Sequence, residues 1–167
     1  MATWQFDFHL LPSAAVSDFY RGTPLTIPRA DFDNHAWWKG VATPANLRAD
    51  LGQLLPSLSS WSPSLERWGL EDGNRIDVIW DSGAIVDFFI RIDVRNISHV
   101  LLVKLLELIR KNGWLIRTQD ERILRPSLTR LLSAIHKSDS FRFVEDPRAF
   151  VEALEKARHS EYDNGMT

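Results

Sequence analysis

The sequence predicts an α+β protein with a mostly antiparallel sheet, helices packed on one face of that sheet, and the other face partly open to solvent. Most strand-like segments lie within the first 95 residues, and helical periods dominate after them. Residues Ala84–Arg95 alternate with a period of two, and most of the charged side chains fall on one side, which indicates a half-solvated strand. Two turn sequences, Asp72–Asn74 and Asp81–Gly83, are typical of tight connections between antiparallel neighbours.

Composition indicates an ordinary globular chain. With 167 residues, 44% of them hydrophobic and 25% charged, we expect a single α+β domain over 1–167, with a frayed tail over 160–167. The net charge of −2 supplies no overall attraction for nucleic acid or an anionic membrane. Because cysteine is absent, a disulfide framework, a thiolate metal site and a cysteine nucleophile are excluded.

The location expected from the sequence is the cytoplasm. The start of the chain, Met1–Trp4, lacks the basic residues and long apolar run of a secretory signal. The longest apolar stretch, around Val100–Ile109, is interrupted by Lys104 and Glu107, and it is shorter than the roughly 20 residues that cross a bilayer. Both observations favour a soluble cytoplasmic protein, and the lack of cysteine fits a reducing compartment.

The first element is a strand, because aromatic and aliphatic residues alternate with polar ones over Trp4–Leu10 before Pro12 ends the run. From Ser13 to Val41 the pattern is weak, and we expect a loop with a short strand near Ala36–Lys39. The pair Thr43-Pro44 is an N-cap and first-turn signal for a helix that stops at Pro56. Its leucines recur at helical spacing: Leu47, Leu51, Leu54 and Leu55.

The middle of the chain predicts a three-stranded meander. Serine and proline dominate between Pro56 and Glu66, which favours a surface loop. Alternation and β-forming residues then indicate three strands joined by the two tight turns. The expected strands are Arg67–Glu71, Arg75–Trp80 and Ala84–Arg95.

Helical periodicity marks most of the remaining chain. The segment Val100–Ile109 is apolar nearly all round and is expected to be a buried helix ended by Gly113. A short strand pair, Trp114–Arg117 with Ile123–Leu124, precedes a helix that begins at Pro126. A last helix is expected to begin at Asp146-Pro147 and to run to about His159.

The charged side of the long strand is one candidate binding surface. Asp87, Arg91, Asp93 and Arg95 fall at even spacing and share one face over roughly 27 Å of strand. Two interpretations stay open, because these charges can pair with a partner protein or with one another and with neighbouring strands. If they face a partner, charge reversal at Arg91 and Asp93 changes binding more than stability.

Three of the seven tryptophans are candidate anchors. Trp37 and Trp38 are adjacent, so on an extended segment they point to opposite faces, and at least one is expected to reach solvent or cover a loop. Trp61 lies among serines and prolines with few local partners. Exposed tryptophans carry much of the binding energy at protein interfaces, although Trp61 can equally hold its own loop against the core.

Catalytic and metal-binding patterns are weak. An acidic residue, Asp77 or Asp87, followed by Asp93 and Arg95 loosely fits a metal-dependent nuclease, but arginine stays protonated and cannot serve as the base. Asp31 and Asp33 lack the glycine and distal glutamate of a calcium loop, and the five histidines show no zinc spacing. Serine-nucleophile, phosphate-binding and dinucleotide motifs are absent from the sequence. The sequence therefore predicts no catalytic residue, metal or cofactor, and enzymatic activity is left open.

Three stretches taken together resemble small bacterial immunity-type proteins, which neutralise secreted toxins in the cytoplasm and are mostly of unassigned function. They are Trp4–Phe8, Arg91–Arg95 and Phe141–Phe150. The resemblance covers the order of elements over most of the chain and implies no site residues. It implies a protein partner, such as a cognate toxin, bound through the open sheet face and the tryptophan-bearing loops.

The expected interface residues are Trp37, Trp38, Trp61, Asp87, Arg91, Asp93 and Arg95. The alternatives are a small-ligand-binding protein or hydrolase with a pocket between the sheet and the helices, and a homodimer that buries the same face. No nucleic-acid or membrane partner is expected.

Overall fold

One seven-stranded antiparallel sheet organises the chain in the computed structural model, which describes residues 3–153. Its strand order is β2-β3-β4-β5-β1-β6-β7, so the first strand lies inside the sheet between β5 and β6. The strands are β1 (Gln5–Pro12), β2 (Ser57–Leu58), β3 (Leu65–Gly69), β4 (Arg75–Asp81), β5 (Ala84–Asp93), β6 (Trp114–Thr118) and β7 (Ile123–Leu124).

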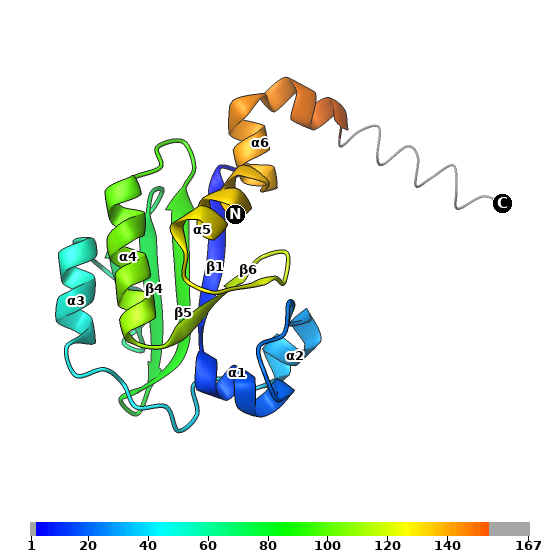
Figure 1. Cartoon of the computed structure of the whole chain (residues 1–167). Coiled ribbons are helices and arrows are strands. Elements are labelled where there is room, and N and C mark those ends of the chain that lie inside the picture. The colour runs from blue at the N-terminus through cyan, green and yellow to red at the C-terminus, as the bar shows by residue number, and fades with distance from the viewer. Residues whose placement is uncertain (1–2, 154–167) are drawn as a thin grey trace.

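Helices cover one face of the sheet almost fully and the other only in part, which confirms the predicted α+β class. Figure 1 shows α3 and α4 on one side of the sheet and α2 on the other. We call the surface opposite α3 and α4 the open face. The helices are α1 (Ser13–Tyr20), α2 (Arg29–Asn34), α3 (Leu47–Leu54), α4 (His99–Lys111), α5 (Leu128–His136) and α6 (Asp139–Glu145).

The main core lies between the sheet and α4. Alternate residues of the central strands, such as Phe8 and Phe88, are fully buried because their side chains project toward this helix layer. Ser98 is the N-cap of α4: its side chain accepts a hydrogen bond from the Leu101 backbone N–H and satisfies one of the free donors of the first turn. However, only one side of α4 is buried. Val100 and Val103 are exposed, so the expectation of a helix buried nearly all round is wrong.

A bulge changes the alternation expected along β5. The pairing with β4 shifts between Ile79 and Trp80, which leaves Val86 as an extra residue on β5. Ile85 is therefore buried and Val86 exposed, the reverse of what strict alternation predicts. Beyond the bulge the period of two holds, and the side chains from Asp87 to Asp93 alternate between the open face and the core as expected.

The weakly patterned segment from Ser13 to Val41 contains two short helices where only loop and a short strand were expected. It contains α1 and α2, and residues 37–40 form a turn where a short strand was expected. Both helices are short, and α2 has no buried residue, so neither produces a long apolar period in the sequence. The two-residue strand β2 was also not predicted.

The end of the chain contains one helix more than expected. The α6 helix precedes the predicted start at Asp146-Pro147, and a second helical stretch follows over residues 147–153. The rest of the predicted last helix and the tail over 160–167 lie outside the described residues. Within residues 3–153, no helix has the length and apolar character needed to span a membrane.

Candidate functional site

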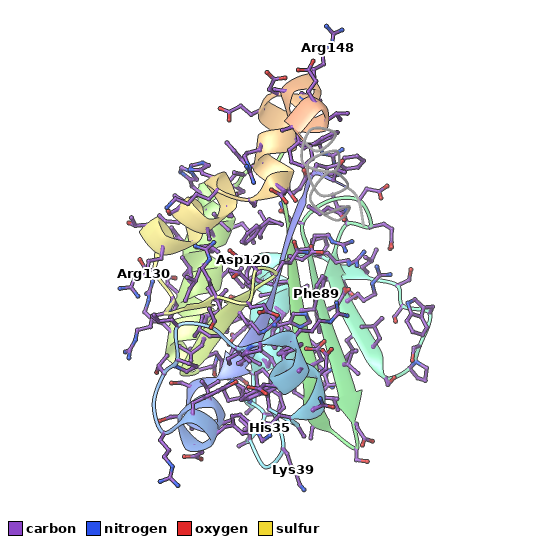
Figure 2. All side chains as sticks on the ribbon, turned by 90° about the vertical axis from the view of Figure 1, so that its right-hand side faces the viewer. His35, Lys39, Phe89, Asp120, Arg130 and Arg148 are labelled. Carbon is purple, nitrogen blue, oxygen red and sulfur yellow. The ribbon has the colours of Figure 1, made fainter. Side chains whose placement is uncertain are left out.

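The open face is exposed over β3, β4 and β5 and covered over β1 and β6. The covering element is α2, whose Phe32 ring lies 4.8 Å from the His9 ring and 4.3 Å from the Arg117 guanidinium carbon. Figure 2 looks onto this face, with α2 in front of the sheet and Phe89 on the uncovered part. The chain thus leaves a surface of three strands available, flanked by α2 on one side and by the 59–64 loop on the other.

The uncovered part is hollowed. A shallow hollow of about 370 Å³ lies over the three strands, and both apolar and charged side chains line it. Trp61, on the serine-rich loop, has 84% of its surface exposed although it borders the hollow. The lining residues are Trp61, Leu65, Arg67, Glu71, Arg75, Asp77, Ile79, Asp87 and Phe89. Below, "the hollow" refers to this set.

The three candidate tryptophans lie in different environments. Of the three, only Trp61 is exposed; Trp37 and Trp38 are 4% and 3% exposed. Neither reaches solvent, which excludes the first of the two alternatives expected for this pair. The turn over residues 37–40 directs both side chains inward, which an extended segment would not do. Trp38 packs on Phe88 and Trp114, and Trp37 donates its indole N–H to the Phe32 carbonyl. Neither indole is available as a surface anchor.

The four charged residues predicted on β5 and just after it are all paired within the molecule. Asp87 Oδ1 lies 2.9 Å from His9 Nδ1, and Arg91 Nε donates to Asp7 Oδ1 at 3.0 Å. Arg95 Nη2 donates to Asp93 Oδ2 at 2.7 Å. The structure therefore favours the interpretation that these charges pair with one another and with the neighbouring strand.

Sequence reasoning missed the densest charged cluster, which lies on β3, β4 and their connecting turn. Arg67 Nε and Arg75 Nε donate to the two oxygens of Asp77 at 3.4 and 3.0 Å. Arg67 Nη2 also donates to both carboxylate oxygens of Glu71 at 3.0 and 2.8 Å. Arg67 lies directly opposite Asp77 in the ladder, whereas the hairpin predicted around Asp72–Asn74 places Arg67 opposite Ile79. The observed connection is longer than the predicted turn, and this difference in register hid the contact.

These contacts stabilise the charged forms of the side chains. The hydrogen bond from Arg67 lowers the pKa of the Glu71 carboxyl and, reciprocally, raises the pKa of Arg67. For Asp93, burial raises the pKa, but the hydrogen bonds from Arg95 outweigh it and the net shift is downward. A carboxylate held ionised by a guanidinium is suited to pairing rather than to proton transfer near neutral pH.

A second hollow of about 380 Å³ lies near α5 and α6 and also contains carboxylates. Asp120 accepts a hydrogen bond from Arg122 at 2.6 Å, and Asp139 accepts one from Arg142. Burial raises the pKa of Asp120, and the hydrogen bonds from Thr118 and Arg122 lower it further than burial raises it. Both carboxylates are thus occupied by arginines, as in the first hollow.

Metal ligation finds no support among residues 3–153, where no three His, Asp or Glu side chains are grouped so that they could hold an ion. The residues of the nuclease and calcium hypotheses have other partners. Asp93 pairs with Arg95, Asp33 pairs with Arg29, and Asp31 accepts a 2.5 Å hydrogen bond from the Tyr20 hydroxyl.

The fold and the open face define a class: an α+β protein with one antiparallel sheet, which presents a firmly paired charged surface with an exposed tryptophan at its border. Comparisons with protein-family models, curated proteins and solved structures found no match for this chain.

Proposed function

We propose that this protein is a non-enzymatic binding module whose partner is another protein, docked on the open face with Trp61 as its anchor. The observation that carries the proposal is the position of Trp61, 84% exposed at the border of the hollow. Ile79 is also exposed in the hollow, and Leu65 and Phe89 are half-buried there, so apolar surface continues from Trp61 across the sheet. Apolar and aromatic centres surrounded by polar groups are typical of protein interfaces.

The edges of the sheet favour docking on the face rather than strand addition. The outermost strands, β2 and β7, are only two residues long, so each offers little backbone for pairing with an added strand. Within the hollow, the Arg67–Asp77 pair joins β3 to β4. These side chains are already oriented before a partner binds, so they lose little conformational entropy on binding.

The particular role we propose is that of a cytoplasmic immunity protein, which binds a toxin and occludes its active site. This narrower proposal rests on the resemblance of three sequence stretches to immunity-type proteins and on the presence of a surface fitted to a protein. On this proposal the hollow and Trp61 contact the toxin. Asp87 belongs to this contact surface, whereas Arg91, Asp93 and Arg95 hold the strands beside it in place, and Trp37 and Trp38 support it only from within the core.

Co-expression tests this role directly. The product of the neighbouring gene would be expressed in cells with and without this protein, and growth would be recorded. We expect the neighbouring product to be harmful alone, and wild-type protein to protect the cells and to co-purify with it. Trp61→Ala should weaken both effects. Leu25→Ala is the matched control, because Leu25 is 86% exposed and lies beside β7 at the opposite sheet edge. A harmless neighbour, or equal protection by both variants, would contradict the proposal.

A homodimer that buries the open face is the competing outcome. Light scattering across a concentration series distinguishes the two, since a dimer built on this face loses mass when Trp61 is replaced. The proposed role predicts a monomer in which Trp61→Ala leaves the mass unchanged.

A further inference from the structure

Two arginines in the hollow are already buried and oriented before any partner arrives. The side chains of Arg67 and Arg75 are only 8% and 10% exposed. Asp77 accepts from both of them and is itself mostly buried. These three groups carry two positive charges and one negative charge, so the site needs one more anion for balance.

Glu71 supplies that anion from the turn between β3 and β4. Its carboxylate contacts Arg67 Nη2 at 2.8 Å and Arg75 Nη1 at 3.3 Å, yet its side chain is 65% exposed. An exposed turn residue can rotate into solvent without opening the core. Of the two carboxylates that balance the arginines, Glu71 is the one a competing anion can replace.

The arginines stay in place without the Glu71 carboxylate. Arg75 Nη1 also donates to the Glu71 backbone carbonyl at 3.2 Å, and Arg75 Nε is held by Asp77. Arg67 Nη1 donates to the Ser59 carbonyl at 3.4 Å, and Arg67 Nε is held by Asp77. An incoming anion therefore meets two guanidinium groups that are already oriented.

Arg75 keeps an unused donor. Arg75 lines the hollow, and its Nη2 donates no hydrogen bond to the described residues, while its Nε and Nη1 are both engaged. Guanidinium groups bind carboxylates through two parallel N–H donors, and Arg75 has its second terminal nitrogen free for this purpose. The apolar border of Trp61 and Phe89 leaves room for the carbon chain that carries the carboxylate.

We propose that the hollow is a carboxylate-binding site in which an acidic side chain of the partner protein displaces Glu71 and pairs with Arg67 and Arg75. This inference rests on the proposed protein-binding function and adds the chemistry of the partner, an aspartate or glutamate. Glu71 then acts as an internal substitute that keeps the buried arginines paired while the protein is free.

A titration with glutarate, a small dicarboxylate, tests the site without any partner. In ¹⁵N-labelled Glu71→Ala protein, glutarate should produce saturable shifts of the Arg75 Nε–Hε and Trp61 indole resonances, at constant ionic strength. We expect glutarate to bind Glu71→Ala about tenfold more tightly than it binds wild type, because the Glu71 carboxylate no longer competes for the two arginines. Glu66→Ala is the matched control. Glu66 lies on β3 next to Arg67 and pairs with Arg48, and this control should behave like wild type. Glutaramide, which has the same length and no charge, should produce no shifts.

Two further variants complete the test. Adding Arg75→Gln to Glu71→Ala should abolish the saturable shifts, and equal weak shifts in all proteins would overturn the inference. If Glu71→Ala does not fold, wild type at high glutarate must still show saturable shifts that Arg75→Gln lacks, and their absence would also overturn it. Since no partner is used, this result is independent of the co-expression test, and either proposal can fail alone.

Discussion

Trp61 and Trp38 are the same residue type in opposite environments within this chain. Trp61 borders the open face in solvent, whereas Trp38 lies in the core against Phe88 and Trp114. Their neighbours in sequence do not reveal this difference, because both lie in segments without a clear period. A solvent-exposed tryptophan on a folded protein is costly in hydration and is common where a partner covers it.

Replacing these two tryptophans should have opposite consequences. Trp38→Ala should lower the free energy of unfolding by about 3–5 kcal/mol, because it leaves a cavity in the core. Trp61→Ala should change it by less than about 0.5 kcal/mol, since the side chain is exposed. Urea denaturation of both variants measures these changes in the free energy of unfolding. A large loss of stability in Trp61→Ala would mean that Trp61 holds its loop against the sheet, the interpretation that competes with an anchor.

Tyr20 provides a second prediction at the residue scale. Burial, together with a hydrogen bond to Asp31, raises its pKa to about 12. A raised folded-state pKa means that the stabilising contribution is complete below the unfolded value, near pH 10, and is lost as the pH rises toward 12. Melting temperatures measured from pH 9 to pH 12 should fall more steeply in wild type than in Tyr20→Phe. Parallel curves for the two proteins would contradict this assignment.

The pairing of β1 with β5 is held by a buried ion pair. Arg91 donates to Asp7, whose side chain is 1% exposed, and the two residues lie opposite each other in the ladder. Removing one partner of such a pair leaves an uncompensated charge away from water. Charge changes at Arg91 should therefore act first on stability, contrary to the expectation from the sequence that they act mainly on binding.

Arg91→Ala should accordingly lower the free energy of unfolding by about 3–5 kcal/mol. Arg95→Ala is the matched comparison and should cost no more than about 1 kcal/mol, because the pair it forms with Asp93 is more exposed. Adding Asp7→Asn to Arg91→Ala should recover part of the lost free energy of unfolding, because the Asp7 carboxylate then no longer leaves an unpaired charge at this position. Equal melting temperatures for Arg91→Ala and Arg95→Ala would show that the Asp7 pair adds no stability.

The elements that the sequence predicts well are those with a strong period or a distinctive turn. The meander from β3 to β5, α4 and α5 are found with shifted ends, because alternation, helical spacing and the turns at Asp72–Asn74 and Asp81–Gly83 are all local. The pairing of Asp7 with Arg91 is not local. It joins residues 84 positions apart and depends on β1 lying beside β5, an order that no single segment encodes.

The candidate site was also predictable only in part, because local patterns reveal some of its features and long-range contacts determine the others. The open face follows from the period of the central strand and agrees with the structure. The sequence left open whether Trp61 is an exposed anchor or holds its loop against the core, and the structure shows it exposed. The burial of Trp37 and Trp38 follows from a turn that places them against distant residues, and the sequence carries no signal for it. The Arg67–Asp77 contact depends on a register that the sequence did not predict, because a hairpin closed by Asp72–Asn74 places Arg67 opposite Ile79.

At the scale of the whole molecule, the two faces of the sheet have different roles. The face under α4 supplies the core, and the opposite face supplies a hollow whose charged side chains are paired within the molecule. With two arginines against three carboxylates, the hollow has only a small net charge, so we expect the association rate to depend only weakly on salt. Specificity then comes from the shape around Trp61 and from the arginines beneath it.

The most direct test of the central claim, that a protein partner docks on the open face through Trp61, is the affinity of the purified protein for the neighbouring gene product. Isothermal titration calorimetry would compare wild type, Trp61→Ala and the equally exposed control Leu25→Ala. The account predicts that Trp61→Ala loses about 2 kcal/mol or more of binding free energy, while Leu25→Ala binds like wild type. Equal affinity of all three proteins, at unchanged stability, would contradict it.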